Sequence, residues 1–88
     1  MENPELEKSI KKRIRIAMGQ INAIDRMIED KRSYDEMLQQ VKASKSAINH
    51  VGELLLEEYL QSELKKAKEG VNVSEKDISS IISKYSSM

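Results

Sequence analysis

Five basic side chains near the start of the chain form the clearest group with a chemical use. No acidic residue interrupts this cluster, which consists of Lys8, Lys11, Lys12, Arg13 and Arg15. At about 100° per residue of helix, Lys8, Lys12 and Arg15 fall within about 60° of one another, opposite the apolar side. We call these three residues the basic ridge. A basic ridge on the solvent side of a helix suits contact with nucleic-acid phosphates, and plain solubility is the alternative interpretation.

The sequence offers little for metal binding or nucleophilic catalysis. It contains no cysteine and a single histidine, His50, so it has no thiolate site and no paired-histidine motif. No Ser–His–Asp arrangement or glycine-rich phosphate loop is present. We interpret His50 as a surface residue and the acidic residues Glu53, Glu57 and Glu58 as a solvated face. We therefore predict no catalytic residue, no metal ligand and no cofactor.

The basic cluster needs a long first helix to present it. Asn3 can cap such a helix, and Pro4 fits its first position, where a missing N–H costs nothing. Apolar residues then recur at alternating spacings of four and three, as in a heptad seam. The predicted helix covers about residues 4–31. Its apolar positions are Ile10, Ile14, Ala17, Ile21, Ile24 and Ile28.

A second, longer helix is predicted over about residues 34–69. Ser33 and Glu36 form the S-x-x-E pattern of a capping box at its start. Gly52 lies in its interior at a cost of about 1 kcal/mol, so we expect a close helix contact there, or else a tolerated weak spot. Lys45 lies on the apolar side, where it either extends to the edge of the seam or reaches a partner or ligand. The other residues of that side are Tyr34, Leu38, Val41, Ile48, Leu55 and Tyr59.

A third, short helix is predicted over about residues 75–86. Gly70 suits the C-terminal cap of the preceding helix, and Ser74 begins the next one. The chain is thus expected to be one all-α domain over residues 1–88, with a long, a longer and a short helix. No stretch reaches the roughly 20 apolar residues that span a bilayer, and the first residues have no signal-peptide core. We expect a cytoplasmic protein without a membrane partner.

The apolar stripes are wider than one pair of helices can bury. The second helix is also longer than the first. Its end would therefore have no helix to pack against, which would leave four leucines partly exposed: Leu55, Leu56, Leu60 and Leu64. A lone domain of this size buries only about 60–65% of its unfolded surface, so its margin of stability is thin. A second copy would cover the bare leucines in a four-helix arrangement. We therefore predict a homo-oligomer.

Two segments of the sequence resemble a known family. The run from Arg13 to Glu29, RIRIAMGQINAIDRMIE, is similar to the pattern R-L-[RK]-R-I-E-G-Q-[VI]-x-[GA]-I-x-x-M-I-E. Residues 54–60, LLLEEYL, are similar to its L-L-x-x-H-L segment. Both patterns belong to the copper-sensing, nickel/cobalt-sensing and formaldehyde-sensing repressors, the CsoR/RcnR/FrmR family. The resemblance covers about residues 8–66.

The resemblance implies an antiparallel four-helix-bundle homodimer that pairs again into a homotetramer. It also implies a repressor that binds operator DNA without a helix-turn-helix. By motif position, the family's DNA contacts fall on Arg13, Arg15 and Lys45. Helical geometry alone adds Lys8 and Lys12 as candidate DNA contacts. The family's thiolate and imidazole sensor donors fall on Tyr34, Tyr59 and Glu63. Phenols and a carboxylate suit soft Cu(I) poorly, so the resemblance implies an altered or lost metal-sensing site.

Two other functions fit the residues without the resemblance. The acidic run that starts at Glu53 suits a helical adaptor that binds a protein partner. Arginines on a long first helix also resemble chorismate mutases, which act by electrostatic stabilisation, although the later basic residues of such a site are not evident.

Overall fold

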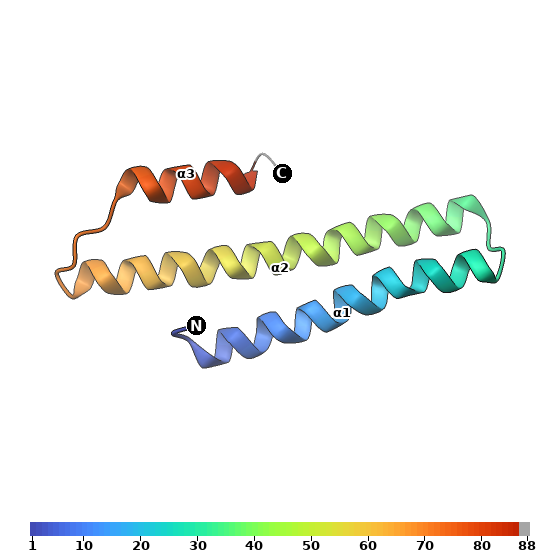
Figure 1. The fold of residues 1–88 in the computed structure, drawn as a ribbon, viewed down its shortest axis with the longest axis horizontal. Helices are drawn as coiled ribbons and strands as arrows, with labels where there is room; N and C mark the ends of the chain where they lie inside the picture. Colours follow the sequence, from blue (N-terminus) through green and yellow to red (C-terminus); the bar gives the residue numbers. More distant parts are fainter. Residues whose placement is uncertain (87–88) are drawn as a thin grey trace.

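The computed structural model describes residues 1–86, which form three α helices in the predicted order (Figure 1). Their bounds are Pro4–Glu29 for α1, Tyr34–Lys68 for α2 and Glu75–Ser86 for α3. This confirms the all-α fold class. The first helix ends before the predicted position because Lys31 adopts a left-handed conformation, with φ 54°, that cannot continue a right-handed helix.

Side chains cap the helices where the sequence predicts. The Asn3 side chain accepts a hydrogen bond from the backbone N–H of Leu6, and Pro4 occupies the first helical position. Ser33 Oγ accepts one from the N–H of Glu36 at 3.2 Å. These bonds satisfy N–H groups that have no partner within the helix, so each boundary is encoded locally.

The link between α2 and α3 also follows its local sequence. Gly70 has φ 81°, a conformation that glycine adopts without the steric cost of a Cβ atom, and it ends α2. Ser74 Oγ then accepts a hydrogen bond from the N–H of Asp77 at 3.1 Å and begins α3. The chain therefore reverses direction after α2 and returns along the same helix (Figure 1).

The three helices form a single layer. The Cα positions extend over 58 × 27 × 11 Å, and α1 and α3 lie along opposite sides of α2 (Figure 1). A layer that is one helix thick cannot enclose a core, because its two broad faces meet solvent. Within residues 1–86, Ile10 and Ala17 are the only buried apolar residues.

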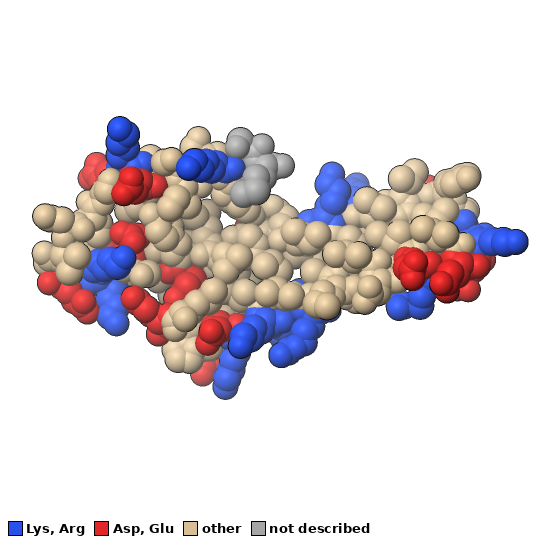
Figure 2. All heavy atoms as spheres, in the orientation of Figure 1, with Lys and Arg blue, Asp and Glu red and all other residues tan. Residues whose placement is uncertain are grey.

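The apolar stripes predicted for α1 and α2 remain mostly uncovered. On α1 the residues of the predicted seam divide into two rows. Ile10 and Ala17 are buried against α2. Ile14, Ile21 and Ile28 stay exposed. Figure 2 shows a broad uncharged band along the layer on the side turned to the viewer, with charged side chains toward its edges. We call the following exposed residues the apolar face: Ile14, Ile21, Ile28, Leu38, Val41, Ile48 and Leu55. The predicted exposure of leucines near the end of α2 is confirmed for Leu55, Leu60 and Leu64.

One residue of the predicted acidic face is buried instead. Glu58 is only 8% exposed, because its position on α2 turns it toward the N-terminal end of α1. Its Oε1 accepts a hydrogen bond from the backbone N–H of Glu2 at 3.0 Å. Its Oε2 is buried and has no hydrogen-bond partner among residues 1–86. The interpretation of Glu58 as solvated was therefore wrong, whereas Glu53 and Glu57 are exposed.

No helix in the described part of the chain is long and apolar enough to cross a membrane.

Candidate nucleic-acid interface and sensor positions

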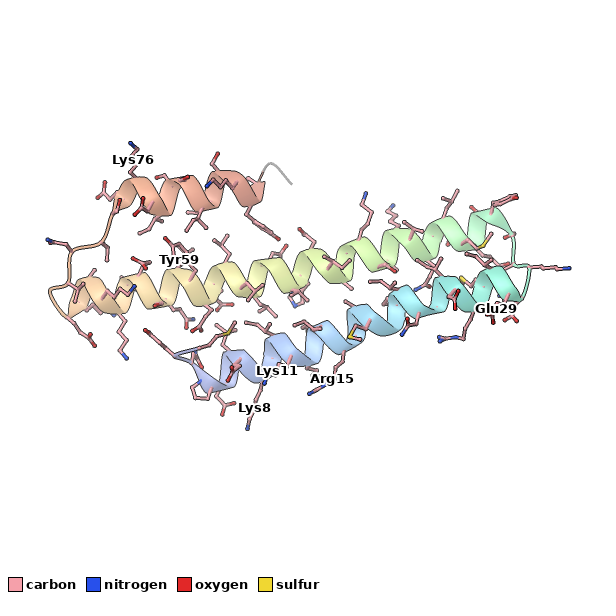
Figure 3. All side chains as sticks on the ribbon, viewed as in Figure 1. Lys8, Lys11, Arg15, Glu29, Tyr59 and Lys76 are labelled. Atoms are coloured by element: carbon pink, nitrogen blue, oxygen red, sulfur yellow. The ribbon has the colours of Figure 1, made fainter. Side chains whose placement is uncertain are left out.

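The basic ridge lies along the outer edge of α1. In Figure 3 the labelled side chains of Lys8, Lys11 and Arg15 project from α1 on the side away from α2. Basic side chains gather at the same edge in Figure 2. Helical geometry dictates this placement, since the apolar side of α1 packs on α2 and turns the opposite side to solvent.

The whole basic cluster, Arg13 included, is exposed. None of its five members forms an ion pair within residues 1–86. Their charges are therefore not neutralised by contacts within the chain. Such an edge presents cations to a polyanion without first having to break internal ion pairs.

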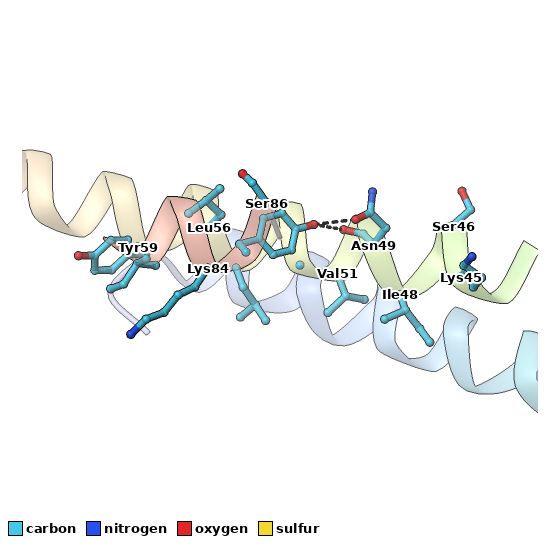
Figure 4. Close-up of a pocket in the computed structure, with 13 residues that line it drawn as sticks. Lys45, Ser46, Ile48, Asn49, Val51, Leu56, Tyr59, Lys84 and Ser86 are labelled. Atoms are coloured by element: carbon cyan, nitrogen blue, oxygen red, sulfur yellow. Dashed lines mark hydrogen bonds between the residues drawn. The ribbon is translucent and has the colours of Figure 1, made fainter. Parts of the chain in front are cut away.

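Lys45 lies apart from the basic ridge. It lines a groove between α2 and α3, and no residue of α1 lines that groove. Figure 4 shows Lys45 at one end of the groove. One chain therefore does not bring Lys45 together with Arg15, although the sequence groups both as candidate DNA contacts.

We call the groove between α2 and α3 the α2–α3 groove. Its volume is about 980 Å³, and most of its wall is apolar. Lys45, Tyr59 and Lys84 add polar groups, and no acidic residue lines it. Its apolar lining comes from Ile48, Val51, Leu55, Leu56 and Ile81.

Tyr85 holds α3 against α2 at the middle of this groove. Its ring packs on Gly52, where an added Cβ atom would lie only 2.5 Å from Tyr85 Cε1. Its hydroxyl lies 2.9 Å from both the backbone oxygen and the side-chain Oδ1 of Asn49, and donates its one hydrogen to them (Figure 4). The close contact predicted at Gly52 is therefore confirmed. The sequence did not predict a role for Tyr85. The glycine in the interior of α2, Gly52, indicated a close contact but not which residue makes it.

The three sensor positions are divided between the two ends of α2. Tyr34 is 81% exposed at the start of the helix. Tyr59 and Glu63 lie near its other end, and a rise of about 1.5 Å per residue puts Tyr59 about 37 Å from Tyr34. Tyr59 lines the α2–α3 groove. No single chain can join all three side chains in one site.

The groups at the far end of α2 suit a metal ion poorly. Glu63 Oε1 already accepts a hydrogen bond from Lys66 Nζ at 3.2 Å. Partial burial raises the pKa of the Tyr59 phenol above its ordinary value, and the nearby carboxylates of Glu63 and Asp77 raise it further against the opposing effect of Lys66. A phenol binds metal as the phenolate, so a raised pKa disfavours that form. Within the described residues, no three His, Cys, Asp or Glu side chains converge on a metal-sized site.

His50 pairs with a neighbour on its own helix. Its Nδ1 lies 3.5 Å from Glu53 Oε2, one turn along α2, and both side chains are about half exposed. This arrangement agrees with the interpretation of His50 as a surface residue.

The described helices define a small all-α protein with a basic edge on α1. Residues 7–84 match the family described as metal-sensitive transcriptional repressor, so nearly the whole chain is covered. The chain belongs to the metal-sensitive transcriptional repressor family. That family consists of regulators and not of enzymes, so membership favours a regulator over the adaptor and chorismate-mutase interpretations. Comparisons with curated proteins and with solved structures gave no match.

Proposed function

We propose that this protein is a homo-oligomeric repressor that binds operator DNA through the basic ridge, Arg13 and Lys45. The observation that carries the proposal is the exposed edge of α1, whose cations form no ion pair within residues 1–86. Phosphate contacts supply most of the affinity of such proteins for DNA, and they need cations that are free to approach the backbone. Family membership supports the same role.

The proposed assembly begins with an antiparallel dimer. A single layer 11 Å thick leaves the apolar face exposed, and a second layer laid on that face would complete a four-helix core. Antiparallel pairing about a twofold axis sets the start of one α2 beside the end of the other, which reduces the separation of Tyr34 from Tyr59 and Glu63. Two dimers then form the proposed tetramer and repeat the basic ridge across a DNA-sized surface.

The proposed sensor differs from a thiolate metal site. The positions that correspond to the family's sensor donors hold two phenols and a carboxylate, and one of these phenols has a raised pKa. Such a set lacks the sulfur and imidazole ligands that hold soft and borderline metals. We accordingly propose that metal sensing is altered or lost, and that the repressor uses no metal cofactor.

A mobility-shift titration over a salt series tests the DNA proposal. The probe is DNA from upstream of the protein's own gene, with a scrambled duplex as competitor. Specific binding should weaken with salt, with a log–log slope of about −0.9 per phosphate neutralised. The Arg15→Ala/Lys45→Ala variant should bind more weakly and show a shallower slope. Lys76→Ala removes an exposed lysine that points away from the layer on α3, and it serves as the matched control (Figure 3).

Two results would contradict the proposal. Equal DNA binding by the double variant and the parent would remove Arg15 and Lys45 as contacts. Failure of the parent to bind its upstream DNA better than the scrambled duplex would remove the operator-binding function.

A further inference from the structure

We propose that the DNA backbone approaches α1 most closely at Gly19, and that Asn22 and Arg26 extend the basic ridge into one continuous contact for DNA phosphates. The proposal rests on the repressor function proposed above and names where on the chain the DNA lies closest. It is carried by a glycine that the fold itself does not explain and by the residues in line with it.

Gly19 occupies the interior of α1 without a reason inside the chain. Glycine is a poor helix former, because it loses more conformational freedom on folding than alanine does. Gly52, the glycine inside α2, makes room for the Tyr85 ring, whereas a Cβ atom added at Gly19 would meet nothing within 4 Å. Gly19 also has no positive φ of the kind that Gly70 has. The missing side chain therefore points to a molecule that approaches from outside the chain.

Gly19 lies in line with the basic ridge. At about 100° per residue, it is within about 40° of each residue of the ridge round the axis of α1. Asn22 and Arg26 continue the line, each about 20° from Arg15. At about 1.5 Å per residue the line is about 27 Å long, with Gly19 near its middle. We call it the outer stripe, and its residues follow one another at spacings of four and three: Lys8, Lys12, Arg15, Gly19, Asn22 and Arg26.

The outer stripe is exposed along its length and carries no negative charge. Its cations form no ion pair within residues 1–86. Asp25 is the only acidic residue between Lys8 and Arg26 in the sequence, and it lies about 100° from Arg26 round the helix. Such a surface attracts a polyanion from one end to the other.

A glycine between two groups of polar side chains suits contact with a phosphate backbone. DNA carries one negative charge per about 1.7 Å of its axis, so a stripe of about 27 Å can meet several phosphates. Arg15 and Arg26 can reach phosphates on either side of Gly19, and the Asn22 amide is a further donor to phosphate oxygens. A side chain at position 19 would hold the phosphates away from the helix.

The proposed second copy does not cover the outer stripe. Gly19 lies about 140° from Ile14 and about 160° from Ile21 round α1, so it is nearly opposite the apolar face. The labelled side chains of Lys8 and Arg15 project away from α2 as well (Figure 3). The stripe therefore stays open in a dimer that is joined through the apolar face, and each copy adds one stripe.

Substitutions at Gly19 in the intact protein test the closest approach, by mobility shift on the upstream DNA and by urea unfolding. Gly19→Leu should be at least as stable as the parent, because leucine is a better helix former than glycine. It should nevertheless bind DNA about tenfold more weakly, because its side chain separates the helix from the phosphates. Gly19→Ala should lie between the two in affinity. Ala67→Leu, exposed near the end of α2, is the matched control and should bind as the parent does.

Substitutions at Asn22 and Arg26 test the extension of the contact. Asn22→Asp keeps the shape of the side chain but adds a negative charge, and it should weaken DNA binding by about threefold to tenfold. Asn72→Asp makes the same change in the exposed link after α2 and should have no effect. Arg26→Ala should reduce the log–log salt slope by about 0.9, the value for one phosphate contact.

Three results would overturn the inference. DNA binding by Gly19→Leu that equals the parent's would show that the glycine is only a tolerated weak spot. Equal affinities of Asn22→Asp and Asn72→Asp would remove the extension of the ridge. A change in the sedimentation of Gly19→Leu would assign the glycine to a contact between copies.

The same measurements separate this inference from the proposed function. Specific binding by the parent that is weakened by Arg15→Ala/Lys45→Ala but not by Gly19→Leu removes only the inference. A parent that binds no DNA removes both.

Discussion

Gln40 of α2 donates from its Nε2 to two oxygens of Gln20 in α1, at 2.6 Å to Oε1 and 2.9 Å to the backbone O. Both side chains are partly buried in the contact between the helices. Next to them, the hydroxyl of the buried Ser44 donates to the Gln40 backbone O at 2.9 Å. A directional polar contact within an apolar seam fixes how far one helix is displaced along the other. This pair therefore sets where the basic ridge lies relative to α2.

Replacing Gln40 by Ala should lower the free energy of unfolding by about 1 kcal/mol, because the Gln20 oxygens lose their donor in a partly buried seam. Urea unfolding measures the effect. Gln39→Ala is the matched control, since Gln39 is exposed and its side chain donates to Asp35 on its own helix. Equal losses from the two variants would show that the inter-helix pair contributes nothing specific.

Replacing Glu58 by Gln should stabilise the protein by about 1 kcal/mol near neutral pH. The Oε2 of Glu58 is buried and has no hydrogen-bond partner among residues 1–86, so a neutral amide costs less to bury there than a charged carboxylate, and it keeps an oxygen that can accept from Glu2. The carboxylate also gains from the nearby N-terminus of α1, but this contributes only about 0.3–1 kcal/mol. Thermal unfolding of the exposed Glu57→Gln variant should change little. A lower midpoint for Glu58→Gln would mean that the attraction to the helix end is the larger effect.

The sequence predicted the helices well because their boundaries depend on adjacent residues. Asn3, Ser33 and Gly70 act on backbone groups within a few positions of themselves, so their roles follow from local patterns. The division of the α1 seam was not predicted. Heptad spacing identifies an apolar stripe, but it does not say which of its residues face the helix in the same chain.

The contacts that the sequence could not predict join distant parts of the chain. Glu58 is buried by Glu2, fifty-six residues away, and nothing in the acidic run distinguishes it from Glu57. Tyr85 finds Gly52 only because α3 folds back along α2. The basic ridge was predictable because it needs no partner, whereas the α2–α3 groove exists only once the two helices are side by side.

Adding a methyl group at two glycines should have opposite effects. Gly19→Ala meets no atom within 4 Å and should stabilise α1 by about 0.5–1 kcal/mol through helix propensity. Gly52→Ala would gain the same propensity but place its Cβ against the Tyr85 ring, so α3 should detach. Hydrogen exchange at the amides of α3 measures this, with faster exchange expected only in Gly52→Ala. Unchanged protection in that variant would show that Tyr85 does not hold α3.

The Tyr59 phenol should make stability fall at high pH. Its pKa is raised in the folded protein, so the protonated form is favoured there relative to the unfolded chain. The contribution is intact below the ordinary tyrosine value of 10.0 and is lost as pH rises through the higher folded value. Phenolate absorbance of the parent minus that of Tyr59→Phe should give a titration with a midpoint above 10.0. A midpoint at or below that value would contradict the assigned effects of burial, Glu63 and Asp77.

Charge placed on the apolar face should convert the proposed assembly to single chains. Leu38 is 67% exposed within one chain, so Leu38→Glu removes no intrachain core contact and should leave each helix intact. In a dimer the same carboxylate would be buried without a partner, at a cost of several kcal/mol. Sedimentation velocity should therefore show the parent as a dimer or tetramer and Leu38→Glu as a monomer, with helical circular dichroism retained.

Val71→Glu supplies the matched control, because Val71 is exposed in the link after α2 and lies outside the apolar face. It should assemble as the parent does. A parent that sediments as a monomer at all concentrations would contradict the proposed assembly, and assembly of Leu38→Glu would place the contact elsewhere. The same samples test DNA binding, since a monomer presents one basic ridge where a dimer presents two. Loss of half the phosphate contacts should reduce the salt slope in proportion.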